Sequence, residues 1–136
     1  MRPLLIVDAA NVVGSVPDGW WRDRAAATRR LRDALAEVAS KGLREAGSEP
    51  LEVLLVVEGA ARPVAGDADG PDEVRVVASP RSGDDTIVDL VRELAEQRQI
   101  IVVTADRALR QAVSRLGASV LGPRSLPHLS RRPEST

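Results

Sequence analysis

Cysteine, phenylalanine and tyrosine are all absent from this sequence of 136 residues. The lack of cysteine excludes disulfides, zinc-thiolate sites and thiol nucleophiles, and it gives no reason to favour an oxidising compartment, so we expect a cytoplasmic protein. The aromatic residues are Trp20 and Trp21, too few for the base-stacking surface of a single-strand-binding protein. We interpret them as a packing anchor before the first long helix, with stacking on a nucleobase as the alternative.

Charge of one sign and long hydrophobic runs are also missing. Nineteen basic residues oppose twenty acidic ones, for a formal net charge of -1, which argues against the broad basic field of a tight duplex-binding protein. The apolar start is interrupted by Asp8 and Asn11, and no later apolar stretch approaches the roughly 20 residues of a membrane-spanning helix. We therefore expect neither export nor membrane insertion.

Short aliphatic segments alternate with amphipathic ones along the chain. Hydrophobic residues make up 43% of the sequence, enough for one core in one domain. The aliphatic runs lack polar alternation, which is typical of strands buried on both faces of a parallel sheet. The pattern predicts an α/β fold, a three-layer α/β/α sandwich around a mostly parallel central sheet. We place strands at 4–7, 51–59, 73–79, 100–106 and 118–122, and helices at 22–42, 84–97 and 107–117.

Composition also divides the remaining segments. Residues 60–72 are rich in glycine, proline, alanine and aspartate, and we expect them to form an exposed loop. We assign residues 1–125 to the folded domain and 126–136 to a flexible C-terminal tail. This tail holds His128, the single histidine of the chain, to which we assign no role.

Acidic residues recur where the predicted strands end. Asp8, Glu58 and Asp106 each close a predicted strand, and Asp84 opens a helix just after one. Because the carboxyl ends of parallel strands share one edge of the sheet, we expect these side chains to meet there. Gathered carboxylates repel one another unless a cation lies among them. Oxygen ligands without thiolate or nearby histidine favour Mg²⁺ or Mn²⁺, an ion that suits phosphodiester hydrolysis.

The neighbouring Asp84 and Asp85 have different expected roles. At 100° per residue, Asp85 points away from the apolar stripe of the helix that contains Ile87, whereas Asp84 lies at the border of that stripe, nearer the sheet. Asp84 is therefore the better candidate for a metal ligand. Asp85 would act through water or by lowering the local potential.

Three stretches together resemble a known family. They are "VDAANVVG", "RSGDDTIV" and "VVTADRALRQAVSRLGASV", and they are similar to the PIN-like nuclease superfamily, in particular its NYN branch of predicted bacterial ribonucleases. The resemblance implies metal-dependent cleavage of RNA, with Asp8, Asp84 and Asp106 as metal ligands. It also implies that Asn11 orients either the first of these aspartates or the substrate phosphate. The sequence departs from the family at Glu58, where an aspartate is common.

The complete set of expected site residues extends this core. Asp8, Asp84, Asp106 and Asn11 are the catalytic candidates, and Glu58 and Asp85 are supporting metal ligands. The expected RNA contacts are Asn11, Thr104, Arg107 and Arg22. Arg22 and the arginines that follow it could hold phosphates, although a run of charge on a helix is more often a solvated face.

Simpler roles compete with these assignments. Asp84 and Asp106 each occupy a position suited to a helix N-cap, Asn11 suits an Asx turn, and Glu58 could merely end its strand. The main functional alternative is a catalytically inactive module of the same fold that binds RNA or a protein partner. A receiver-like domain is disfavoured, because the required acidic pair and late lysine are missing. RNA is the expected partner, and a homodimer is compatible with the sequence.

Overall fold

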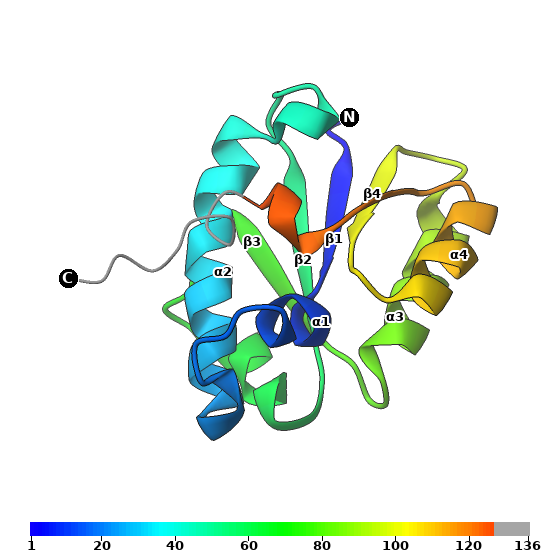
Figure 1. Cartoon of the computed structure of the whole chain (residues 1–136). Helices are drawn as coiled ribbons and strands as arrows, with labels where there is room; N and C mark the ends of the chain where they lie inside the picture. Colours follow the sequence, from blue (N-terminus) through cyan, green and yellow to red (C-terminus); the bar gives the residue numbers. More distant parts are fainter. Residues whose placement is uncertain (127–136) are drawn as a thin grey trace.

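The computed structural model describes residues 1–126, which form one sheet covered by helices. All five strands are parallel, in the order β3-β2-β1-β4-β5. The α/β fold class predicted from the alternating pattern is confirmed (Figure 1). The strands are β1 (Leu4–Asp8), β2 (Glu52–Val57), β3 (Val74–Ala78), β4 (Ile100–Val103) and β5 (Ser119–Leu121).

Helices cover both faces of the sheet and complete three layers. The α-helices are α1 (Ala9–Gly14), α2 (Arg24–Lys41), α3 (Gly83–Leu94) and α4 (Arg107–Arg115). Short 3-10 segments lie at Trp20–Arg22, Arg44–Ala46, Gly59–Gly66 and Pro123–Ser125. Within residues 1–126 no helix combines the length and the hydropathy needed to cross a membrane.

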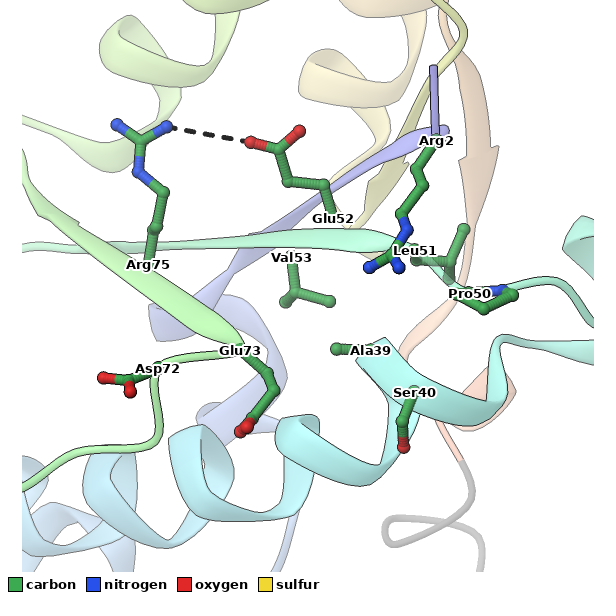
Figure 2. A pocket seen from close by; sticks show the side chains of 10 residues that line it. All are labelled: Arg2, Ala39, Ser40, Pro50, Leu51, Glu52, Val53, Asp72, Glu73 and Arg75. Carbon is green, nitrogen blue, oxygen red and sulfur yellow. Dashed lines mark ion pairs between the residues drawn. The ribbon is translucent and has the colours of Figure 1, made fainter.

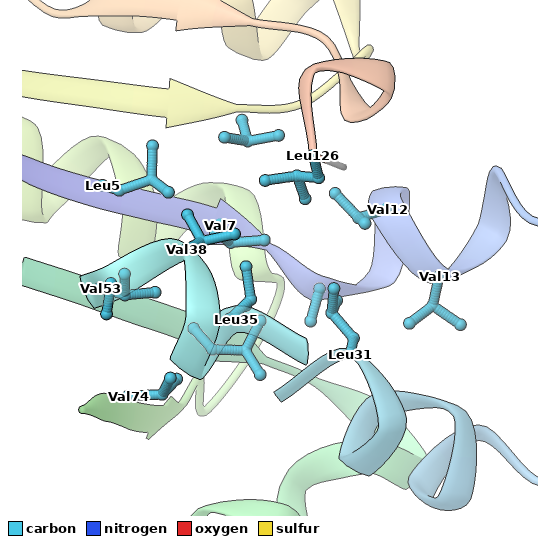
Figure 3. Close-up of a cluster of buried hydrophobic side chains, with 14 of the residues drawn as sticks. Leu5, Val7, Val12, Val13, Leu31, Leu35, Val38, Val53, Val74 and Leu126 are labelled. Carbon is cyan, nitrogen blue, oxygen red and sulfur yellow. The ribbon is translucent and has the colours of Figure 1, made fainter. Parts of the chain in front are cut away.

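The alternation of side chains along β1 explains the two cores. Leu5 and Val7 point to one face, where they pack with α1, α2 and neighbouring strands (Figure 3). Leu4 and Ile6 point to the other face and pack with α3 and α4. Because both faces are covered, every residue of β1 is buried, as the unbroken aliphatic run predicted.

The strand order creates a topological switch point beside the end of β1. The chain runs from β1 through β2 to β3 on one side, and then returns to β4 and β5 on the other. Open α/β sheets bind ligands at such a switch point, outside the carboxyl ends of the strands. Here the switch point lies between β1, which ends at Asp8, and β4, which ends at Val103.

One short element was not predicted, and one local prediction was wrong in part. Residues Ala9–Gly14 form the short helix α1, which the sequence analysis did not place. The segment 60–72, expected to be an exposed loop, begins within the 3-10 segment Gly59–Gly66, whose Ala61 and Val64 are buried. Asp67 fastens this segment to α2, because Arg29 and Arg32 both form ion pairs with its carboxylate.

The end of the described chain is well packed. Leu126, the first residue of the expected tail, is 1% exposed and belongs to the core shared with α2. The rest of that segment, 127–136 with His128, lies outside the described residues.

Candidate active site

Asp8 is the most deeply buried acidic residue of the expected site. It ends β1 and is only 3% exposed. Its carboxylate accepts hydrogen bonds from the Thr104 hydroxyl at 3.0 Å and from the Asn11 backbone N–H at 3.5 Å. The second bond makes Asp8 the N-cap of α1, so its carboxylate contributes to the start of that helix.

A relay of hydrogen bonds connects β1 with the loop that follows β4. The fully buried Thr104 donates to Asp8 and accepts from the Asp106 backbone N–H at 3.1 Å. The Asn11 side-chain oxygen accepts from the backbone N–H of Ala105 at 2.8 Å. Asp106 in turn caps α4 by accepting from the Leu109 N–H at 3.0 Å. These bonds hold the two sides of the switch point in fixed register.

The neighbouring charges and burial disturb the titration of two aspartates. Burial, opposed by the Thr104 hydrogen bond and reinforced by the charges of Asp84 and Glu58, raises the pKa of Asp8 to about 6. The pKa of Asp84 is also raised, first by burial and then by the charges of Asp106, Glu58 and Asp85. These charge effects show that Asp84 and Glu58 act on Asp8, and that Asp106, Glu58 and Asp85 act on Asp84; the convergence of all four acids on one ion stays a prediction.

Glu58 lies against the start of α3 rather than simply ending its strand. It follows β2 without capping the next 3-10 segment. A Cβ atom on Gly83 would lie 3.2 Å from its Oε1 atom, so the absence of a side chain at Gly83 leaves room for the Glu58 carboxylate. This arrangement places Glu58 next to the turn that carries Asp84.

The start of α3 depends on residues that the sequence analysis missed. Ser82 is the N-cap and accepts from the Asp85 N–H, so the N-cap role considered for Asp84 is wrong. The fully buried Ser79 is hydrogen-bonded to the Ser82 carbonyl at 2.6 Å and to the Thr86 hydroxyl at 2.7 Å. The sequence signal for this role was Ser79 itself, which stands between the end of β3 and Pro80.

The donor set fits a hard cation, although a complete centre is not preformed. The carboxylates and hydroxyls at these strand ends offer only oxygen ligands, which suit Mg²⁺ or Mn²⁺. Within residues 1–126 no three acidic or histidine side chains are gathered tightly enough to form a ready metal centre. Sharing of one ion by Asp8, Asp84 and Asp106 therefore stays a prediction, and it requires their side chains to turn toward the ion.

A cleft lies at the opposite edge of the sheet from the predicted site (Figure 2). It has a volume of about 540 Å³ and is lined by residues near the starts of β2 and β3, among them Glu52 and Arg75. Their side chains form an ion pair with each other at 3.8 Å, on the other side of the strands from Ala39 and Ser40. None of the expected site residues lines this cleft.

Comparison with known proteins assigns the family. The family described as the YacP-like NYN domain matches residues 5–134. This chain belongs to that family. The match agrees with the NYN resemblance carried by the three quoted stretches, and membership supports a ribonuclease-type function.

Solved structures support the fold of this YacP-like NYN domain. The crystal structure of Rae1 (YacP) from Bacillus subtilis matches with a TM-score of 0.72 and 23% sequence identity, over 92% of this chain and 71% of that chain. A mutant of the same protein matches with a TM-score of 0.71 and 23% identity, over 93% and 73% of the two chains. No curated protein sequence matches this chain.

The remaining predicted residues of the YacP-like NYN domain are more exposed. Asp85 and Arg107 are both exposed, and Asp85 acts on Asp84 through its charge. Arg22 is exposed and lies over the Trp21 ring, with its guanidinium carbon 5.9 Å from the ring centroid. Among the described residues, Arg22 and Arg107 form no ion pair with the carboxylates at the strand ends.

Replacing Thr104 with valine should disturb both sides of the relay. The variant loses the donor to Asp8 and the acceptor for the Asp106 N–H, at a cost of about 1–3 kcal/mol in unfolding free energy. Because the Thr104 hydrogen bond lowers the pKa of Asp8, its removal should raise that pKa further. Denaturant unfolding and NMR titration of the Asp8 carboxyl group measure the two effects.

Thr104→Ser is the matched control, since it keeps the hydroxyl at the same place. It should retain the Asp8 titration of the parent protein. Equal titration of Asp8 in the valine and serine variants would contradict the relay.

Proposed function

We propose that this protein is an endoribonuclease that hydrolyses RNA phosphodiester bonds with a carboxylate-bound Mg²⁺ or Mn²⁺. The observation that carries the proposal is the buried Asp8 at the switch point of a YacP-like NYN domain, repelled by Asp84 and Glu58. A carboxylate in that environment gains stability from a nearby cation. A strongly perturbed acid in a crevice is also a common feature of catalytic sites.

Each residue of the site has a proposed role. Asp8, Asp84 and Asp106 hold the cation, with Glu58 and Asp85 in support. A bound cation of this kind lowers the pKa of its water and offsets the developing charge of the phosphodiester. The chain supplies no histidine within residues 1–126, so an imidazole base from that part takes no share in the chemistry.

The other expected residues position the substrate and the ligands. Asn11 and Thr104 fix the loop after β4 through hydrogen bonds to Ala105, Asp106 and Asp8. Asn11 therefore supports the site through the backbone, and a direct contact with phosphate is the less favoured part of the prediction. The exposed Arg107 and Arg22 are proposed to contact RNA phosphates.

The alternative is an inactive domain of the same fold that binds RNA or a protein partner. Two observations favour it: the formal net charge of -1 and the lack of a preformed three-ligand centre within residues 1–126. In that case the aspartates would serve as helix caps, a role that Asp8 and Asp106 already have. We propose a cytoplasmic location for the protein with either function.

Metal-dependent cleavage separates the two functions. Single-stranded RNA is incubated with the protein in Mn²⁺, in Mg²⁺ and in EDTA, and the products are resolved by electrophoresis. We expect cleavage with either metal and none in EDTA. Asp84→Asn should abolish this cleavage, because the buried side of α3 loses a metal ligand.

Asp89→Asn is the matched control on the same helix. Asp89 is exposed and pairs with Arg92 at 3.3 Å, so its replacement should leave the rate unchanged. The enzyme proposal fails if the parent leaves RNA intact with both metals, or if Asp84→Asn cleaves as fast as Asp89→Asn.

A further inference from the structure

A small cleft adjoins the carboxylates at the strand ends. Its volume is about 290 Å³, and Ala10, Trp20, Arg24 and Glu58 are among the residues that line it. Glu58 belongs both to this cleft and to the group of carboxylates that raises the pKa of Asp8. A ligand in the cleft would therefore lie directly beside the proposed cleavage site.

Trp20 supplies a fixed aromatic wall. It is half-buried and packs against the core formed with α1 and α2. The Trp21 ring meets it edge to face, with centroids 6.1 Å apart and an angle of 86°. A ring held in this way offers a base-stacking surface at little entropic cost.

Arg24 supplies the only unpaired positive charge in the lining. Its guanidinium carbon lies over the Trp20 ring, 5.2 Å from the centroid, so a base that stacks on this face moves the guanidinium aside, toward the phosphate. Other arginines of α2 are paired: Arg29 and Arg32 with Asp67, and Arg30 with Asp18. Among residues 1–126 no carboxylate lies within ion-pair distance of Arg24, so its charge is free to bind an anion.

We propose that this cleft seats one nucleotide of single-stranded RNA next to the scissile phosphate, with its base against Trp20 and its phosphate at Arg24. The inference rests on the proposed ribonuclease function. The Glu58 carboxylate in the lining repels phosphate, and Arg24 in another part of the lining attracts it. A base can reach the indole only when it is unstacked from a duplex, so single-stranded RNA is the expected substrate class.

The stacking wall also predicts weak selectivity for base identity. An indole face accepts any base. The Thr28 hydroxyl in the lining already donates its proton to the Arg24 carbonyl at 2.7 Å, so it has no donor left for an acceptor on a base edge. The cleft therefore recognises the presence of a nucleotide more than its sequence.

Salt dependence tests the role of Arg24. Binding of a fluorescein-labelled single-stranded oligoadenylate is measured by anisotropy at several salt concentrations, in an Asp8→Asn background that keeps the RNA intact. Arg24→Gln should weaken binding and reduce the slope of log K against log salt by about 0.7, the value for one phosphate contact on a single strand. Arg30→Gln is the matched control on the same helix and should keep the slope.

Tryptophan fluorescence tests the stacking wall without disturbing the core. In an Asp8→Asn, Trp21→Phe chain, Trp20 is the sole emitter, and the unlabelled oligoadenylate should quench it with the affinity found by anisotropy. Unchanged Trp20 emission at saturating RNA, or equal salt slopes for Arg24→Gln and Arg30→Gln, would overturn the proposal.

The two proposals fail separately. If the parent cleaves RNA but the Arg24 and Trp20 results are negative, the nucleotide cleft is wrong and the nuclease stands. If the oligoadenylate binds with the expected slope and quenching but no metal supports cleavage, the cleft stands and the nuclease is wrong.

Discussion

Asp8→Asn is expected to lower the rate of metal-dependent RNA cleavage by about a thousandfold, since a catalytic metal supplies several kcal/mol of transition-state stabilisation and each 1.36 kcal/mol is worth a factor of ten. Asp8 is the buried member of the expected ligand set. Asparagine keeps the size and one oxygen for the Thr104 hydroxyl but removes the charge that holds the cation. Initial cleavage rates of the two proteins at equal metal concentration measure the loss.

The same substitution should leave the fold intact, which separates a catalytic effect from unfolding. Circular dichroism should show the parent spectrum, and the metal-free variant should melt no lower than the parent. A tenfold loss of rate corresponds to an increase of about 1.4 kcal/mol in the activation free energy. A variant that retains more than about a tenth of the parent rate would contradict the role of Asp8.

The second large effect is on stability as a function of pH. The pKa of Asp8 is about 6 in the folded protein, against about 4 in an unfolded chain. The folded state therefore holds this proton more tightly than the unfolded state does. The contribution of Asp8 to stability is fully present below pH 4 and is lost as the pH rises to 6.

A shift of about two pKa units corresponds to about 3 kcal/mol, at 1.36 kcal/mol per unit. Without metal, the unfolding free energy of Asp8→Asn relative to the parent should accordingly rise by about that amount between pH 4 and pH 7. Urea unfolding of both proteins in EDTA across this range measures the difference, in which the titration of groups distant from Asp8 cancels. A difference that stays flat, or that falls with pH, would show that Asp8 is not a repelled buried carboxylate.

The architecture could be predicted from the sequence because local patterns determine it. The run from Leu4 to Val7 lacks polar alternation and is buried on both faces. The apolar residues Ile87 and Val91 recur at helical spacing and face the sheet. These features depend on neighbours in the sequence, so periodicity alone identifies them.

The missed features depend on contacts between distant residues or on very short segments. The helix α1 has only six residues, too few for an amphipathic pattern, and a site role was preferred over a cap for Asp8 because the long helix begins well downstream. The segment after β2 has the composition of an exposed loop, but ion pairs of Asp67 with Arg29 and Arg32 hold it against α2. Composition carries no information on such pairs.

The candidate site also combines features that local sequence patterns predict with features that depend on distant residues. Strand ends predicted that Asp8, Asp84, Glu58 and Asp106 would share one edge; the charges of Asp84 and Glu58 raise the pKa of Asp8, and those of Asp106 and Glu58 raise the pKa of Asp84. The hydrogen bond from Thr104 to Asp8 joins residues 96 positions apart, and no local motif announces it. The side-chain rotations that a bound ion would require are likewise absent from the sequence pattern.

The central claim is that a divalent cation binds among the carboxylates at the end of β1 and the start of α3. Thermal melting of the parent and of Asp8→Asn during a Mn²⁺ titration tests it directly. The account predicts that the parent gains about 2.7 kcal/mol of stability at a hundredfold excess of Mn²⁺ over Kd, and that Asp8→Asn gains almost none. A parent melting curve that is indifferent to Mn²⁺, or equal gains for both proteins, would contradict it.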